Sequence, residues 1–139
     1  MLVTRSPRKD RGAESAGAAL VGEIGVHPDE QRLEILTING GSAMPVSPPD
    51  RYVYEYDWTP DGEGLVITDA GGDGDANWWV ATLDYLSAAS GELRTIAAPK
   101  FEMDIPRASP DGRSVAFVGG LMSDWGNIGG DIYVVPISG

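Results

Sequence analysis

The sequence predicts an all-β fold, specifically an incomplete β-propeller of about two to three four-stranded antiparallel blades. A four-residue turn phrase occurs twice, at 59–62 and 109–112, and its prolines are 50 residues apart (110 − 60). Short runs with strand-like alternation flank each copy. The composition agrees, because 19 glycines and 10 prolines accompany plentiful aromatic and β-branched residues. This mixture favours short strands joined by tight turns over long helices.

The turn phrase reads Thr-Pro-Asp-Gly at 59–62 and Ser-Pro-Asp-Gly at 109–112. Proline sets φ at the first central position, and the aspartate or the preceding hydroxyl can hydrogen-bond nearby amides. The glycine then adopts the left-handed conformation that lets the chain reverse. Each copy is therefore expected to close a hairpin.

Period-2 alternation flanks these turns, as half-buried strands require. Aromatic residues occupy every second position from 52 to 58. Short apolar runs at 65–68 and 114–118 follow the two turns and are typical of inner strands. We predict antiparallel strands near residues 51–58, 63–69, 80–88, 93–98, 104–109, 114–119 and 131–137.

A third strand closes each unit. The segment 83–91 aligns with 131–139, the segment 33–40 aligns with both, and their terminal glycines at 40, 91 and 139 are 51 and 48 residues apart. A repeat of ~40–50 residues with four short antiparallel strands is the signature of a propeller blade.

The repeat divides the chain into blades. Residues 19–50 are assigned to the latter half of blade one, 51–100 to blade two, and 101–139 to a blade three that lacks its outer strand. Residues 1–18 are expected to be a flexible leader. Because propellers close with about 4–8 blades, these units are too few to close a ring.

Two features favour other local structures. Trp79, Leu83 and Leu86 would share one face of a helix, and 75–90 contains neither glycine nor proline. Pro136 lies in a predicted strand, where its missing N–H removes a ladder hydrogen bond. We retain the strand prediction at both places.

Charge and composition exclude several classes of protein. The net charge is −11, and from Gly12 onward 6 basic and 20 acidic residues give −14. Such a surface repels phosphate backbones, so we expect no nucleic-acid partner. No stretch reaches the ~18 apolar residues of a membrane helix, so we expect no membrane partner. The sequence has no cysteine, which fits a reducing compartment, and we expect a cytoplasmic location.

Four segments carry a resemblance to a known family: 54–62, 77–81, 98–100 and 106–124. Together they resemble the N-terminal propeller of prolyl-oligopeptidase-family serine peptidases of the acylaminoacyl-peptidase or dipeptidyl-aminopeptidase type, over roughly residues 30–139. The Ser-Pro-Asp-Gly phrase is shared with TolB-type and WD40-like propellers generally. The tryptophan pair and the loop 121–124 are more particular to the peptidases.

The resemblance implies a propeller that caps a separate α/β-hydrolase domain and admits short peptides. The catalytic serine, acid and histidine of that family belong to the hydrolase domain, so none is carried over to this chain. The implied partners are further propeller blades and a hydrolase domain, with peptide substrates reached only through that domain.

No catalytic residue is predicted. A hydrolase of this type needs Gly-x-Ser-x-Gly, and the nearest segment places Ser42 between Gly41 and Ala43, with Met44 in place of the second glycine. The only histidine, His27, precedes Ser42, whereas the histidine comes last in α/β-hydrolases. We interpret His27 as a surface-loop residue. For lack of a triad we set aside a free-standing hydrolase.

No metal or cofactor is predicted either. Asp73, Asp75 and Asn77, with Asp84 twelfth from Asp73, resemble the spacing of a calcium loop. However, Trp78 occupies the position that needs glycine, so a polar blade loop is the preferred interpretation. The segment 71–74 contains an aspartate that would repel phosphate. We expect Trp78 and Trp79 to pack at a blade interface rather than to hold a ligand.

Two functions therefore remain open: a non-catalytic, substrate-gating propeller portion of a prolyl-oligopeptidase-like peptidase, and a TolB-type propeller fragment that binds or scaffolds proteins. In either case the open blade faces are expected to expose apolar residues such as Val134, Ile35 and Ile38. Exposed sheet faces and edges promote association with other chains. We expect this association to increase with salt, because salt screens the negative charge.

Overall fold

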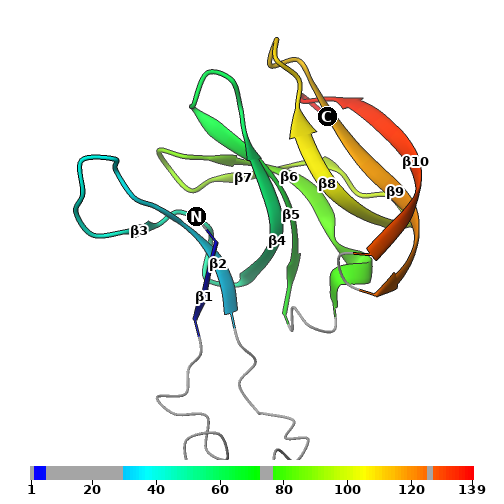
Figure 1. The fold of residues 1–139 in the computed structure, drawn as a ribbon, viewed down its shortest axis with the longest axis horizontal. Coiled ribbons are helices and arrows are strands. Elements are labelled where there is room, and N and C mark those ends of the chain that lie inside the picture. Colours follow the sequence, from blue (N-terminus) through cyan, green and yellow to red (C-terminus); the bar gives the residue numbers. More distant parts are fainter. Residues whose placement is uncertain (1, 6–29, 73–76, 125–126) are drawn as a thin grey trace, which may run out of the picture.

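The computed structural model describes residues 2–5, 30–72, 77–124 and 127–139, and the fold is all-β with antiparallel sheets, as predicted (Figure 1). Sheet one has the order β1 (Leu2–Arg5), β2 (Glu30–Ile35) and β3 (Met44–Pro45). Within the described residues no helix is long and apolar enough to cross a membrane.

Sheet two is a four-stranded meander in chain order. Its strands are β4 (Arg51–Trp58), β5 (Gly64–Gly71), β6 (Thr82–Ser87) and β7 (Leu93–Ala97), and the 3₁₀ turn η1 (Trp78–Val80) precedes β6. Sheet three repeats the first three of these strands as β8 (Glu102–Ala108), β9 (Ser114–Asp124) and β10 (Asn127–Pro136). The predicted strands from residue 51 onward are therefore confirmed, including the strands at Leu83 and Pro136.

The two predicted turns have the same hydrogen bonds. In the first, Gly62 N–H donates to Thr59 O at 2.9 Å, and Glu63 N–H donates to Asp61 Oδ1 at 3.0 Å. In the second, Gly112 N–H donates to Ser109 O at 2.9 Å, and Arg113 N–H donates to Asp111 Oδ1 at 3.1 Å.

The backbone conformation of these turns explains why both end in glycine. Gly62 and Gly112 have φ angles of 73° and 68°, the left-handed region that side chains disfavour. Thr59 and Ser109 each donate their hydroxyl to the aspartate two residues on, at 2.6 Å in both turns. The turn phrase therefore predicts the place of each turn, the left-handed glycine and the aspartate bond to an amide, and the structure adds the hydroxyl–aspartate bond.

Sheet two lies between the other two sheets and is buried on both faces (Figure 1). Leu33 of β2 packs against Leu65 and Ile67 of β5. Val66, between them in sequence, points to the opposite face and packs with Val115 and Phe117 of β9. Because β5 is central in its sheet and covered on both sides, it is buried from Gly64 to Ala70.

Sheet one departs from the expectation of a flexible leader over residues 1–18. Leu2–Arg5 form β1, which pairs antiparallel with β2 so that Leu2 lies opposite Leu33. These four residues thus pair with a strand that is distant in sequence. The rest of the predicted leader lies outside the described residues.

Candidate functional site

The residues considered for catalysis are not brought together in the described part of the chain. Ser42 lies exposed in the connection between β2 and β3. The only histidine, His27, lies outside the described residues.

The calcium-loop residues have other partners where the structure describes them. Asp73 and Asp75 lie outside the described residues. Asn77 donates its side-chain N–H to Gly71 O at 2.7 Å, and Asp84 is buried in the middle of sheet two. Among the described residues no group of three acidic or histidine side chains is arranged to hold a metal.

The tryptophan pair divides between two environments. Trp78 packs against a small buried cluster of Tyr54, Ala70 and Ala81 at the end of sheet two. Trp79, its neighbour on η1, is 57% exposed. Trp78 thus packs on residues of its own sheet, whereas much of the Trp79 ring faces solvent.

The most unusual polar cluster in the described residues crosses three strands of sheet two. Arg51 on β4 donates from Nε to Asp69 Oδ2 on β5 at 2.6 Å and from Nη2 to Asp84 Oδ2 on β6 at 3.3 Å. Thr82 Oγ1 also donates to Asp84 Oδ2, at 2.6 Å. The Asp69 and Asp84 side chains are 0% and 2% exposed, whereas that of Arg51 is 26% exposed. We call Arg51, Asp69, Asp84 and Thr82 the sheet-two network.

The sheet-two network contains two unlike carboxyl groups. Burial raises the pKa of Asp69 to about 7; its contact with Asp84 adds to this shift, and Arg51 opposes it. Burial also works against the charged form of Asp84, but hydrogen bonds with Asp69, Thr82 and Thr95 outweigh it and lower its pKa. Burial therefore favours the protonated form of Asp69 more than that of Asp84, and Arg51 contacts both carboxyl groups, at the shorter distance to Asp69.

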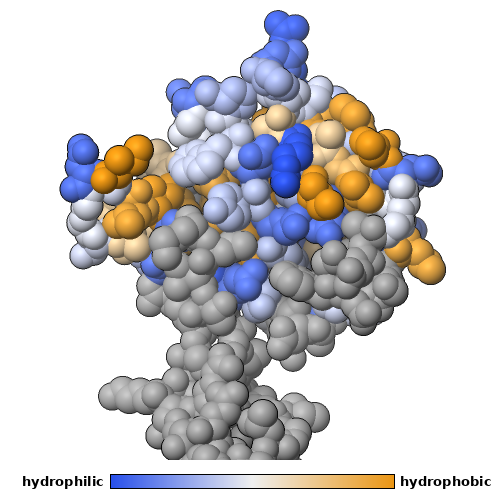
Figure 2. Space-filling model, viewed as in Figure 1, coloured by the Kyte–Doolittle hydropathy of each residue, from blue (hydrophilic) through white to orange (hydrophobic). Residues whose placement is uncertain are grey.

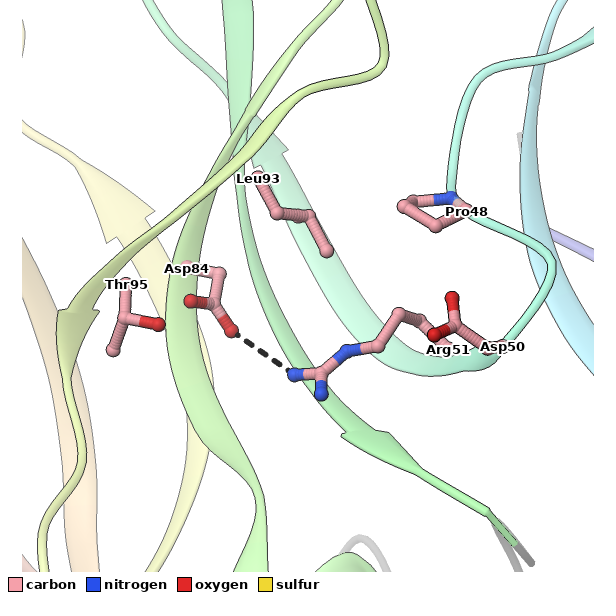
Figure 3. Close-up of a pocket in the computed structure, with 6 residues that line it drawn as sticks. All are labelled: Pro48, Asp50, Arg51, Asp84, Leu93 and Thr95. Atoms are coloured by element: carbon pink, nitrogen blue, oxygen red, sulfur yellow. Dashed lines mark hydrogen bonds and ion pairs between the residues drawn. The ribbon is translucent and has the colours of Figure 1, made fainter.

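A pocket of 310 Å³ opens onto this network (Figure 3). Its lining combines the Arg51 and Asp84 side chains with Pro48 and Asp50 from the segment before β4 and with Leu93 and Thr95 of β7. The hydrogen bonds of Arg51 are directed to residues of its own sheet. The arrangement is therefore suited to cross-linking β4, β5 and β6.

The corresponding place in sheet three is aromatic. Gly119 is the counterpart of Asp69, because Gly119 lies opposite Met103 on β8 and Asp69 lies opposite Val53 on β4. Tyr133 is the counterpart of Asp84, because Tyr133 lies opposite Phe117 and Asp84 lies opposite Ile67. Phe101, 50 residues after Arg51 (101 − 51), stacks on Tyr133 with ring centroids 4.8 Å apart. A side chain at Gly119 would collide with the Phe101 ring. Equivalent positions thus hold an ion-pair network in one sheet and an aromatic stack in the next.

A second polar feature joins neighbouring sheets through side chains of β2 and β4 that reach the backbone of β4 and β8. Glu55 and Asp57 on β4 accept hydrogen bonds from the backbone N–H groups of Ile105 and Ala108 on β8. Gln31 on β2 similarly donates to Val53 O on β4, at 2.9 Å. Side chains of one sheet therefore satisfy backbone groups on the edge of the next sheet.

The backbone of β8 is shaped for this contact. Ile105 has a φ of 54° within a bulge between Asp104 and Arg107, and this directs its N–H toward Glu55. Burial, followed by the contact with Asp104, raises the pKa of Glu55 to about 7. At neutral pH this junction therefore sits near the midpoint of a carboxyl titration.

No protein-family model matches the chain, and no curated protein matches it. The interpretation of these sites therefore depends on their geometry.

Sequence reasoning missed both polar features. A signal was present for the first, because Asp69 and Asp84 interrupt otherwise apolar strands, and charges in such positions need partners. A signal was present for the second in the alternation of Glu55 and Asp57 on one face of β4. Their partners are distant in sequence, so only the sheet register identifies them.

Proposed function

We propose that the three sheets are consecutive blades of an incomplete β-propeller, and that the chain is a non-catalytic, substrate-gating portion of a prolyl-oligopeptidase-like serine peptidase. In this proposal the chain guides short peptides toward an α/β-hydrolase domain and leaves the chemistry to that domain. A cytoplasmic location belongs to the same proposal, since the chain has no cysteine.

The observation that carries the proposal is the serial packing of the sheets. Sheets two and three are antiparallel meanders in chain order, closed by equivalent turns, and each sheet lays a face on the next. Radial repetition of such meanders is the defining feature of propellers. The strands that carry Glu55 and Asp104 lie next to each other at the start of their sheets, where a propeller has its central channel.

The first test is chemical. The purified chain is expected to leave acyl-peptide and aminoacyl chromogenic substrates unchanged and to resist a fluorophosphonate serine probe, since catalysis of this type needs an activated serine. Stoichiometric labelling of Ser42 or of any other serine would overturn the non-catalytic assignment. A Ser42→Ala variant is the matched control for labelling in the connection between β2 and β3.

The alternative is a TolB-type propeller fragment that binds or scaffolds proteins. It is favoured by the exposed aliphatic residues on sheet three, which are typical of protein contact surfaces. The gene sequence downstream of codon 139 separates the two functions. Further repeats followed by a Gly-x-Ser-x-Gly domain support the peptidase, whereas further repeats followed by a stop codon support the scaffold.

A further inference from the structure

The connection between β2 and β3 carries an Asn-Gly pair. Asn39 and Gly40 lie within a run of exposed residues, 36–42, and Ile38 beside them is fully exposed. This connection projects from sheet one, away from the other two sheets (Figure 1). The Asn39 side chain and the peptide bond that follows it are therefore open to water.

An asparagine followed by glycine can react with its own backbone. The amide nitrogen of the next residue attacks the side-chain Cγ, and a five-membered succinimide ring forms. The Nδ2 group leaves as ammonia with the proton of the attacking nitrogen. Water then opens the ring at either of its carbonyl groups, which gives aspartate or isoaspartate. Glycine favours the attack because it has no Cβ that would crowd the nitrogen.

The local structure leaves this pair free to react. Gly40 has a φ of 89°, and nothing lies within 4 Å of the position that a Cβ would occupy. Its N–H donates to Thr37 O at 3.0 Å, and the Thr37 hydroxyl donates to Gly40 O at 2.6 Å. Exposed hydrogen bonds of a single turn open readily. No described residue is hydrogen-bonded to the Asn39 side chain.

The other two asparagines of the chain have different surroundings. Asn77 donates its side-chain N–H to Gly71 O at 2.7 Å, so the leaving nitrogen is tied to the backbone, and Trp78 follows it in sequence. Asn127 begins β10 and is followed by the β-branched Ile128, and both residues are paired with β9. A bulky following residue and a fixed backbone both hinder ring closure.

The Asp-Gly pairs of the two repeated turns are a second internal comparison. Ring closure at an aspartate needs the neutral carboxyl group, because a carboxylate has no good leaving group. Asp61 Oδ1 accepts from the Thr59 hydroxyl and from Glu63 N–H, and these bonds lower the pKa of Asp61. Asp111 in the second turn has the same pair of bonds. Of these three glycine-flanked sites, Asn39 is the one with an uncharged and unbound side chain.

We propose that Asn39 is a site of spontaneous deamidation, in which the Gly40 nitrogen attacks the side chain and water completes the conversion to aspartate and isoaspartate. Either product adds a negative charge close to the exposed Leu36 and Met44. Figure 2 shows hydrophobic side chains near this connection, at one end of the molecule. Isoaspartate also adds a methylene to the main chain, so the hydrogen bonds between Thr37 and Gly40 are expected to be lost. The proposal depends on this connection alone and stands whether or not the chain belongs to a peptidase.

Peptide mapping of the folded chain after incubation at pH 8 tests the proposal. Trypsin separates the sites, since Asn39, Asn77 and Asn127 fall in the peptides 33–51, 52–94 and 114–139. We expect peptide 33–51 to gain one mass unit at least ~10 times faster than the other two. It is also expected to split into two chromatographic peaks, of which isoaspartyl methyltransferase labels one.

Two glycine variants separate the reacting bond from the connection around it. Gly40→Ala crowds the attacking nitrogen and is expected to slow the mass gain by roughly tenfold. The matched control is Gly41→Ala, the same change at the next left-handed glycine, which has a φ of 120°. It leaves the attacking nitrogen uncrowded, so the rate is expected to stay nearly unchanged. Far-ultraviolet circular dichroism identifies a folding defect in either variant.

Unfolding in guanidinium chloride tests the contribution of the fold. We expect the rate at Asn39 to change by less than about threefold, because its exposed turn already opens readily. Methyltransferase labelling at Asp61 and Asp111 is expected to rise by about tenfold or more, because their side-chain hydrogen bonds are lost. The proposal would be overturned by no mass gain on peptide 33–51, by equal rates at the three asparagines, by equal slowing in the two glycine variants, or by a mass gain confined to the unfolded chain.

Discussion

Sheets two and three are built on one plan but have opposite surroundings. They share strand order, turn hydrogen bonds and cross-strand register, yet among the described residues sheet two is covered on both faces and sheet three on one. Leu83 is 0% exposed where its counterpart Ile132 is 76% exposed. The sequence repeat thus determines which residues form a face of each sheet. Whether that face adds to stability depends on a neighbouring sheet that covers it.

Truncating one aliphatic side chain in each sheet is expected to give the largest difference in stability between the two sheets. We expect Leu83→Ala to lower the free energy of unfolding by about 3 kcal/mol, because it leaves a cavity between sheets two and three. Its counterpart Ile132→Ala is expected to change it by less than ~0.5 kcal/mol in the monomer. Urea unfolding at a concentration where the chain is monomeric measures both; equal losses would contradict the unequal coverage.

The sheet-two network gives the second expected difference in stability. Arg51→Ala removes the partner of two buried aspartates, and we expect a loss of about 2 kcal/mol, typical of hydrogen bonds to charged groups. Replacing the three charged members by their sheet-three counterparts, as Arg51→Phe, Asp69→Gly and Asp84→Tyr together, is expected to cost less than Arg51→Ala, since no buried charge is left unpaired. Urea unfolding of both variants is the measurement. A triple variant less stable than Arg51→Ala would show that the two sites are not equivalent.

The sequence could predict strands and turns because their signals are local. Residues 51–58 were predicted as a strand and form β4 over those positions, and the turn glycines at 62 and 112 have the expected left-handed φ. Val134 and Ile38 are exposed as expected, whereas Ile35 is half-buried. The pairing of β1 with β2 and the meeting of Arg51 with Asp84 join residues distant in sequence, and no local pattern specifies such pairs.

The junction between sheets two and three is expected to respond to pH. Glu55 has its pKa raised from 4.5 to about 7. Between pH 4.5 and pH 7 the folded state therefore keeps a proton on Glu55 that the unfolded state has released. Stability from this group is present below pH 4.5 and is lost as pH rises through 7. Asp69 acts in the same direction, since its pKa is raised from 3.8 to about 7.

Glu55→Gln isolates this contribution. Glutamine can still accept from Ile105 N–H and can donate to Asp104, with Arg107 the nearby cation. We expect the wild-type free energy of unfolding to fall between pH 5 and pH 8, and the variant to remove about 1 kcal/mol of that fall, a value reduced for the partial exposure of Glu55. Unfolding curves at the two pH values measure this. An unchanged fall in the variant would assign the pH response to other groups.

The two turns give the smallest effect and the closest match between the sheets. Gly62→Ala and Gly112→Ala each force a side chain into the left-handed region, at a cost of about 1 kcal/mol. A Cβ atom added at Gly62 has no neighbour within 4 Å, and one added at Gly112 makes only ordinary van der Waals contacts with Pro60. Thermal unfolding is expected to give equal losses for the two variants; a clear inequality would mean that the turns are not repeats of one another.

Amide hydrogen exchange tests the central claim that sheet two is the interior of a serial stack. β6 is hydrogen-bonded on both edges and buried between sheets, whereas β10 is paired on one edge, by β9. We expect amides of β6 to exchange only with global unfolding, while about half of those in β10, the outward-pointing ones, exchange far faster. Uniform protection across β6 and β10, or faster exchange in β6, would contradict the serial packing of the three sheets.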